Sequence, residues 1–246
     1  AGYEGPLYAE ISPRTFSILA RQGSRLSQLR LRRGASRLDD AQLAELQQSH
    51  GLVSATANPD AGGKDNSDFL ASINDGIGLS VNLHAGGPDG IIGWRARKHA
   101  GLIDIDKPAS QPISRFWEAV RTDDLTGGGL VLNPDEFYIL ASREFVCVPS
   151  SYAAEMRAYD TRVGEFRAHY AGFFDPGFGM SDIGAAPTRA VLEVRSHDVP
   201  FLIEHGQIVC RLVYEPMADV PEALYGAQGS GSNYQSQGLK LAKHFC

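Results

Sequence analysis

The succession of short apolar stretches from Gly76 to Met217 limits the possible fold more than any other feature of the sequence. These stretches recur about every 8–12 residues and are separated by Gly, Pro and Asn turns, as strands are in sandwiches and barrels. Helical patterns do not alternate with them, as they would in a chain of βαβ units. The sequence therefore predicts a mainly β protein, and residues 5–34 predict three further strands.

Two short helices are expected in addition. Asp39 or Asp40 can cap a helix in which Leu43 and Leu46 recur at helical spacing. The stretch "SYAAEM", residues 151–156, predicts the second helix. Residues 54–68 are rich in Gly, Asn, Asp and Ser, which is typical of a loop or linker.

Composition argues against several classes of protein. The 246-residue chain has a formal net charge of -6, whereas a general nucleic-acid surface requires a basic stripe. No apolar run reaches the length of a membrane span, and the first residues lack the basic and apolar regions of a signal peptide. The 3 cysteines form no C-x-x-C pair, which suits a reducing compartment. We therefore expect a cytoplasmic protein with no membrane or nucleic-acid partner.

Two distant stretches of the chain resemble each other. Residues 8–34 can be laid over residues 191–217 without a gap, and this pairs Glu10 with Glu193, Gly23 with Gly206 and Leu29 with Leu212. The match predicts an internal repeat. The alternative is a chance match between two β-rich stretches, each with a turn.

The repeat suggests a division of the chain into four parts. Residues 1–34 would be the C-terminal tail of a first repeat, and residues 35–75 a helical and polar linker. Residues 76–217 would form a complete second repeat, and residues 218–246 a flexible C-terminal segment.

Several motifs in the second repeat occur in a recognisable order. They are "NPDEFYILASREFVCVPSSYAAEM", "FFDPGFG", "AVLEVRS", "IEHGQIVCRLVYEPM" and the tail "ALYGAQGSGSNYQSQGLKLAKHF". In this order the chain resembles the two-repeat branch of the deoxycytidine triphosphate deaminase family, within the trimeric deoxyuridine triphosphatase superfamily. The resemblance implies a distorted jelly-roll, or deoxyuridine triphosphatase-like, β-barrel that assembles as a homo-oligomer, either a trimer or a dimer.

The same resemblance implies a reaction. It is the hydrolytic deamination of dCTP to dUTP and ammonia, in the synthesis of dUTP and dTTP. Mg²⁺ would be bound through the substrate triphosphate. Zinc is not expected, because zinc deaminases carry H-x-E and P-C-x-x-C motifs that this sequence lacks.

The hairpin "FFDPGFG" is expected to recognise the deoxyribose. By the resemblance, Asp175 accepts a hydrogen bond from the sugar hydroxyl, and the ring of Phe178 packs on the sugar. Pro176 and Gly177 suit the turn, because proline presets φ and glycine permits a positive φ. The alternative is that Asp175 only caps its own turn.

Glu193 is one of two candidates for general acid and base catalysis. A glutamate can take a proton from the attacking water and deliver it to the cytosine ring and the departing amine. Glu10 holds the matched position in the first repeat and is a second candidate. Val191 and Leu192, on the same strand, are expected to contact the substrate. The alternative for Glu193 is a solvated position on an edge strand.

Arg157 and Arg162 are expected to bind the triphosphate. Guanidinium groups suit phosphate oxygens, and the family places two arginines at this spacing. The family also has a serine after the first arginine, where this chain has Ala158. The substitution raises the possibility that catalysis belongs to the first repeat. Solvated surface arginines are the alternative.

The polar tail is expected to close over the nucleotide. By the resemblance, Tyr225, Asn233 and Gln237 lie at or near the contacting positions, and closure would exclude water. A plain flexible terminus fits the composition as well. Two other functions stay open: a deoxyuridine triphosphatase, and a non-catalytic repeat that binds nucleotide or supports structure.

Overall fold

A computed structural model describes residues 2–57, 69–84, 89–158, 166–168, 172–180, 186–196, 198–227 and 238–246. Its helices are α1 (Asp40–His50), the single turn α3 (Ile113–Phe116) and the 3₁₀ turn η2 (Thr122–Asp124). Its strands are β1 (Ser17–Leu19), β2 (Val53–Ser54), β3 (Ile77–Asn82), β4 (Ile91–Ala96), β5 (Leu102–Asp104), β6 (Trp117–Arg121), β7 (Gly129–Leu132), β8 (Phe137–Val146), β9 (Tyr152–Ala158), β10 (Phe166–Ala168), β11 (Phe173–Phe174), β12 (Thr188–Ser196), β13 (Phe201–Glu204) and β14 (Ile208–Pro216).

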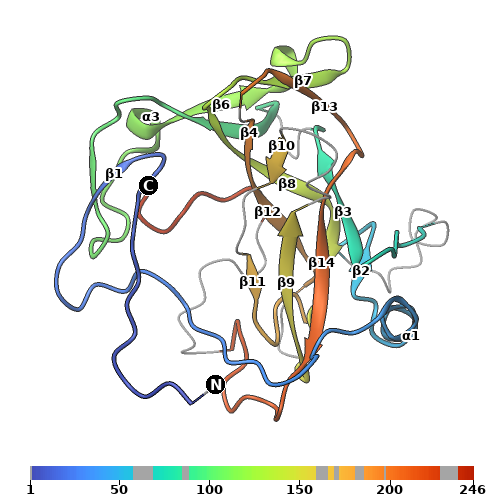
Figure 1. The fold of residues 1–246 in the computed structure, drawn as a ribbon. Helices are drawn as coiled ribbons and strands as arrows, with labels where there is room; N and C mark the ends of the chain where they lie inside the picture. Colours follow the sequence, from blue (N-terminus) through green and yellow to red (C-terminus); the bar gives the residue numbers. More distant parts are fainter. Residues whose placement is uncertain are drawn as a thin grey trace.

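One large antiparallel sheet organises these strands. Its main path runs β10-β12-β8-β3-β14-β9-β11, and β2, β4 and β6 join it through β8 and β4. The sheet curls so that its strands surround a shared interior (Figure 1). Two small sheets, β13-β7 and β1-β5, lie outside this path. The prediction of a mainly β fold is confirmed, and strands occur in each apolar stretch expected from Gly76 onward.

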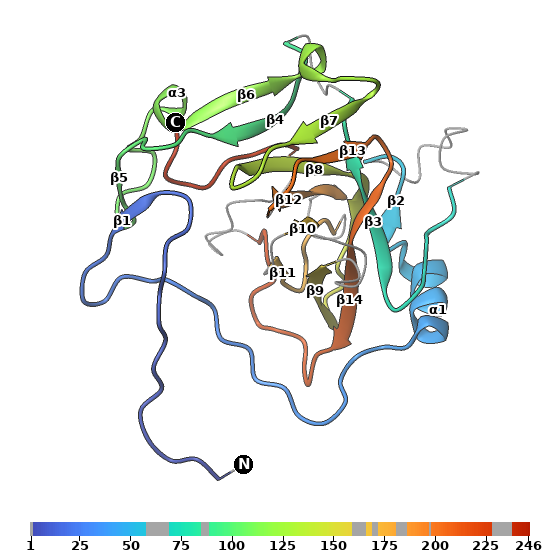
Figure 2. The same cartoon turned by 45° about the horizontal axis from the view of Figure 1, so that its top comes forward.

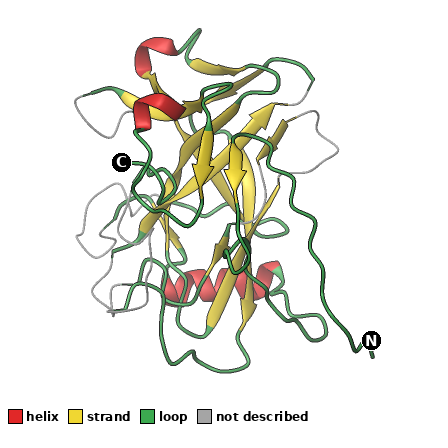
Figure 3. Ribbon diagram, turned by 90° about the vertical axis from the view of Figure 1, so that its left-hand side faces the viewer, coloured by secondary structure: helices red, strands yellow, loops and turns green. Residues whose placement is uncertain are grey.

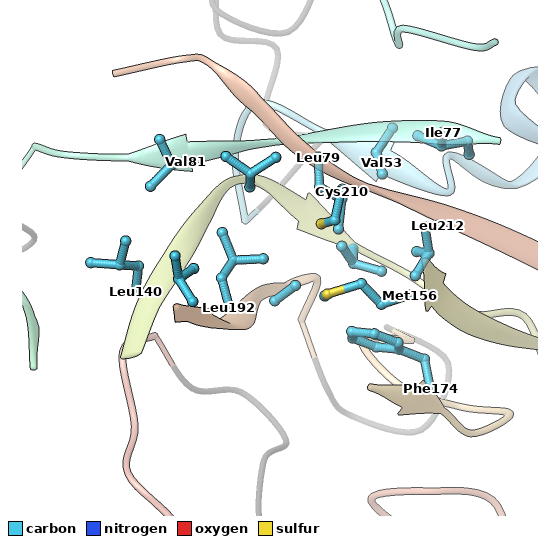
Figure 4. Close-up of a cluster of buried hydrophobic side chains, with 14 of the residues drawn as sticks. Val53, Ile77, Leu79, Val81, Leu140, Met156, Phe174, Leu192, Cys210 and Leu212 are labelled. Atoms are coloured by element: carbon cyan, nitrogen blue, oxygen red, sulfur yellow. The ribbon is translucent and has the colours of Figure 1, made fainter. Parts of the chain in front are cut away.

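The interior of the curled sheet is filled by apolar side chains. They come from β3, β8, β9, β12 and β14 and from the hairpin after β11, and Figure 4 shows a part of the cluster. Alternation along a strand selects its members, because successive side chains point to opposite faces. On β12, Ala190, Leu192 and Val194 are fully buried in this cluster, while the residues between them face outward.

A second, smaller apolar cluster covers the outer face of the sheet. Ile139 of β8 contributes to it, together with Trp117, Phe116 and Leu241. The end of the chain is fixed here, since the Ile113 amide donates to the Cys246 carbonyl at 3.0 Å, and the C-terminus lies close to α3 (Figure 2). Residues at the end of the predicted C-terminal segment, 218–246, therefore contact the turn α3 and the second apolar cluster.

The first predicted helix is confirmed. Asp39 accepts a hydrogen bond from the Gln42 amide, and the Gln42 side chain accepts one from the Asp39 amide, which completes a capping box. Gly51 ends the helix with φ of 61°, in the left-handed region that favours glycine. Leu43 and Leu46 bury the inner face of α1, which lies beside the sheet (Figure 3).

The second predicted helix is wrong. Residues 152–158 form β9, which pairs with β14 from Tyr152↔Pro216 to Ala158↔Cys210. Helix propensity is a weak preference, and the long antiparallel partner overrides it. The short helix appears instead at Ile113–Phe116.

The N-terminal segment, residues 2–38, contains less regular structure than predicted. Of the three expected strands only β1 is present, and it pairs in parallel with β5. The rest of the segment runs as irregular backbone along the outside of the barrel (Figures 1 and 2). Within the described parts of the chain, no other partner strand reaches it, so its alternating pattern is not converted into a sheet.

Candidate active site

The Asp-Pro-Gly hairpin is fixed firmly against the barrel. The Gly177 amide donates to the Val148 carbonyl at 3.0 Å, and the Val148 amide donates to the Phe178 carbonyl at 2.8 Å. Gly177 has a φ of 98°, which an L residue rarely adopts. At Gly179 a Cβ would lie 2.1 Å from the Val146 carbonyl oxygen, so only glycine fits this approach. The hairpin therefore presents Asp175 in a defined place.

The carboxylate of Asp175 already has partners. Arg30 Nη2 donates to Asp175 Oδ1 at 2.7 Å, and Gln28 Nε2 donates to the same oxygen at 3.1 Å. Arg30 also donates to the Ala154 carbonyl and lies 4.2 Å from the centre of the Phe173 ring. The N-terminal segment thus forms hydrogen bonds with the Asp175 carboxylate, which was predicted to bind the sugar.

Two of the predicted residues meet beside this hairpin. The rings of Phe178 and Tyr225 are 5.8 Å apart, and the Tyr225 amide donates to the Pro176 carbonyl at 2.8 Å. Phe178 is only 6% exposed and also packs edge-on against Phe174. Tyr225 therefore lies over the ring that was predicted to pack on the sugar.

Glu193 lies on the outer face of β12. Its backbone pairs with Ile139, and solvent reaches its side chain. The surrounding protein nevertheless displaces water from the carboxylate, and this desolvation raises the pKa of Glu193 above its ordinary value. No hydrogen bond or ion pair engages Glu193 among the described residues, so it is free to exchange protons.

The side chains of Val191 and Leu192, which precede Glu193 on β12, point in opposite directions. Val191 shares the outer face with Glu193 and packs against the second apolar cluster. Leu192 is fully buried in the main core. Of the predicted pair, Val191 can offer a side chain to a ligand, whereas Leu192 can offer only its backbone.

Glu10 has a different environment from Glu193. It lies in irregular, exposed backbone of the N-terminal segment. Within the part of the chain that the structure describes, it makes no hydrogen bond or ion pair with Glu193, Asp175 or any other residue. The structure does not bring the two candidate glutamates together.

The predicted phosphate-binding residues are only partly described. Arg157 lies near the end of β9, where its guanidinium is 3.6 Å from the Asp75 carboxylate. This pair is exposed, and exposed pairs contribute little to stability. Arg162, Asn233 and Gln237 lie outside the described residues.

Two arginines contact the site without having been predicted to do so. Arg30 pairs with Asp175, and Arg32 pairs with Glu155 at 2.6 Å and Glu215 at 2.7 Å. The signal in the sequence is the alternation "LRLRRG", residues 29–34, within the segment predicted to form strands. The arginines face the barrel, whereas Leu29 and Leu31, which alternate with them, are 71% and 91% exposed.

The donor groups of the described residues do not gather into a metal site. Nowhere in the described ranges do three or more His, Cys, Asp or Glu side chains lie close enough to hold an ion.

None of the helices in those ranges is both long and apolar enough to cross a membrane.

Comparisons with known proteins support the resemblance seen in the sequence. The family model for the C-terminal domain of 2'-deoxycytidine 5'-triphosphate deaminase matches residues 39–245, and the model for the N-terminal domain of the same enzyme matches residues 1–35. A protein named "dCTP deaminase, dUMP-forming" from Methanobrevibacter smithii is 30% identical over 136 residues, which cover 54% of this chain and 65% of that protein. A protein of the same name from Methanothermobacter thermautotrophicus is 28% identical over 145 residues, covering 56% and 68%.

A solved structure is also similar. The crystal structure of 2'-deoxycytidine 5'-triphosphate deaminase from Agrobacterium tumefaciens is 48% identical, with a TM-score of 0.70, over 86% of this chain and 57% of that chain. This likeness confirms the fold class predicted from the sequence. The chain spans about two thirds of these curated relatives and little more than half of the solved protein.

Proposed function

Because the chain belongs to the 2'-deoxycytidine 5'-triphosphate deaminase family, we propose that it deaminates dCTP hydrolytically, with Glu193 as the general acid and base. The observation that carries this proposal is the position of Glu193. It lies on a paired strand of the matched domain, has no partner among the described residues, and has a raised pKa. These are the properties of a group that can take and return protons.

The chemistry requires one water molecule and one proton shuttle. The Glu193 carboxylate removes a proton from water as the oxygen attacks C4 of the cytosine, and the proton passes to N3 of the ring. After a second proton transfer, the amine leaves as ammonia and a carbonyl forms at C4. Ala158 offers no hydroxyl to this water. We therefore assign the orientation of the water to Glu193.

The nucleotide would be held by the groups that the family resemblance indicates. We propose that Asp175 receives the sugar hydroxyl, for which the Arg30 ion pair must open or share the carboxylate. The triphosphate would be bound by Arg157 and Arg162. We expect Mg²⁺ to be held by the phosphate oxygens, since the described residues supply no set of carboxylate and imidazole ligands.

The product distinguishes two candidate functions. The sequence predicts dUTP, but both curated relatives are named as dUMP-forming. Their names favour a second step, in which water attacks the triphosphate and diphosphate leaves. We propose deamination as the first step and treat dUTP hydrolysis as the second candidate function.

The experiment measures both products from two substrates. The protein is incubated with dCTP and Mg²⁺, and ammonia and diphosphate are quantified; dUTP is the parallel substrate. Ammonia from dCTP without diphosphate supports a deaminase that releases dUTP. Both products from dCTP support a dUMP-forming enzyme. Diphosphate from dUTP with no ammonia from dCTP identifies a deoxyuridine triphosphatase, and binding without either product identifies a non-catalytic repeat.

We also propose that the chain assembles as a homo-oligomer, a trimer or a dimer. Several large apolar side chains of the N-terminal segment are exposed, including Leu29 and Leu31, and such surface favours a partner. Light scattering at micromolar protein is expected to give a multiple of 26.6 kDa. A monomeric mass with full ammonia release would contradict this.

A further inference from the structure

A cleft of about 240 Å³ lies beside the candidate site, and none of its lining residues has a role in the function proposed above. Its walls come from the N-terminal segment, the turn after β4, the loop before β8, and β12. Basic side chains predominate in it. They are Arg14, Arg97, Lys98, His99 and Arg195, against the two acids Asp135 and Glu136.

The two acids compensate these cations only in part, because Asp135 attracts Arg195 and Glu136 attracts Lys98 without forming an ion pair. Glu136 accepts hydrogen bonds from Tyr138 and Asn133 and lies 3.5 Å from Arg95, which is outside the cleft lining. In the described ranges, none of Arg14, Arg97, Lys98 and Arg195 is within ion-pair distance of a carboxylate. With four Arg and Lys side chains against two carboxylates, the cleft therefore has an excess of positive charge.

Arg195 gives the cleft a fixed cation. One of its terminal nitrogens donates to the Asp135 carbonyl at 3.2 Å, and the other donates to Thr15 Oγ1 at 2.9 Å. The guanidinium lies 5.4 Å from the centre of the Phe137 ring. Its Nε atom is buried and has no hydrogen-bond partner among the described residues. A buried N–H without a partner is unfavourable.

The backbone around the cleft is also unusual. His99 and Asp135 have φ values of 58° and 57°, although neither is glycine. Residues other than glycine adopt this region at a cost and are often found at functional sites. The strained turns place the side chains of both residues at the cleft.

We propose that this cleft is a binding site for a phosphate-bearing anion. Arginine guanidinium groups bind phosphate oxygens through parallel hydrogen bonds, and Lys98 adds a point charge. Arg195 follows Glu193 by two residues and shares its face of β12, so their Cα atoms are about 6–7 Å apart. The anion has two possible sources: the phosphates of a nucleotide lying across Glu193, or free inorganic diphosphate.

The test is calorimetric titration of the 246-residue chain with inorganic diphosphate. The double variant R97Q/K98Q removes two exposed cations, together with the 3.4 Å hydrogen bond from Arg97 Nε to the Trp117 carbonyl, and R195Q removes the fixed one. We expect each to weaken diphosphate binding by about tenfold or more. R33Q, an exposed arginine outside the cleft lining, is the matched control and should bind as the unmodified chain does. Thermal melts show whether R195Q still folds.

Competition between dCTP and diphosphate distinguishes the two possible sources of the anion. If dCTP displaces diphosphate and R97Q/K98Q weakens both ligands, the anion is the nucleotide's own phosphate group. If diphosphate still binds when dCTP is saturating, the cleft takes the free anion. The proposal is overturned if diphosphate does not bind, if R97Q/K98Q leaves its binding unchanged, or if only R157Q weakens it. Because these measurements need no turnover, their failure is distinguishable from a failure of the deamination assay.

Discussion

Leu29 and Leu212 hold matched positions in the two similar stretches of the chain, but Leu29 is 71% exposed whereas Leu212 is fully buried. The same contrast separates Glu10, in irregular backbone, from Glu193, on a strand with neighbours on both sides. Leu212 belongs to β14, which pairs with both β3 and β9. Similar patterns therefore give different structures when partner strands are present for one and absent for the other.

The difference extends to which side chains face the barrel. Alternate residues of β14 bury apolar groups in the core. Along residues 29–32, alternation instead turns arginines toward Asp175, Glu155 and Glu215 and leaves leucines outside. Around residues 29–32 the N-terminal segment is thus held by ion pairs, whereas the second stretch is held by buried apolar area.

The largest expected effect concerns the two glutamates. Glu193→Gln should lower the rate of ammonia release from dCTP by about 10²- to 10⁴-fold, because an amide cannot shuttle a proton. Glu10→Gln is the matched control and should leave most of the rate in this chain. Steady-state ammonia assays check this, with dCTP binding measured separately. The reverse pattern would place catalysis with Glu10, and equal loss from both would indicate a composite site.

A second large effect is expected on stability at the matched leucines. Leu212→Ala removes a side chain from the core and should lower the free energy of unfolding by about 2–5 kcal/mol. Leu29→Ala removes an exposed side chain and should change it by no more than about 0.5 kcal/mol. Urea denaturation followed by circular dichroism measures both. A destabilisation by Leu29→Ala as large as that by Leu212→Ala would show that the N-terminal segment is packed in solution.

The ion pair that joins the two regions predicts opposite effects on binding. Asp175→Ala should weaken dCTP binding by about 1–3 kcal/mol, since the sugar hydroxyl loses its acceptor. Arg30→Gln releases the Asp175 carboxylate and should leave dCTP binding equal or tighter, by up to about 1 kcal/mol for a partly exposed pair. Calorimetry on both variants, with R33Q as control, checks this. Unchanged affinity in Asp175→Ala would remove that carboxylate from the site, and weaker binding in Arg30→Gln would make Arg30 part of it.

The smallest effect is a pH dependence. The pKa of Glu193 is raised in the folded chain by desolvation, so the folded state holds its proton at pH values where the unfolded state, with a pKa of about 4.3, has released it. Stability from this group is therefore present at low pH and is lost as pH rises through the folded pKa. Urea denaturation between pH 4 and 8 should show this loss in the unmodified chain and not in Glu193→Gln. The apparent pKa of the acidic limb of the kcat/KM profile should also be higher than the ordinary glutamate pKa. Identical pH dependence in both proteins would contradict the desolvation.

Local features of the sequence determined much of the fold outside the N-terminal segment. Alternation predicted the strands from Gly76 onward, Asp39 and the leucine spacing predicted α1, and Pro176-Gly177 predicted the tight hairpin. These elements could be predicted because side-chain alternation, helix capping and positive φ depend on residues that are close together in the sequence. The position of Glu193 on the outer face of a strand follows from the same alternation.

Tertiary structure alone decided the rest. Residues 152–158 have a helical composition but form β9 because β14 offers them a partner along their whole length. The pattern of residues 5–34 predicted strands, yet only β1 found a neighbour among the described residues. Arg30 meets Asp175, and Arg14 meets the cleft beside Arg195, across long separations in the chain. Strand pairing and charge contacts of this kind depend on which segments come together in space. A pattern along the sequence does not show which distant segments will be close in the folded chain.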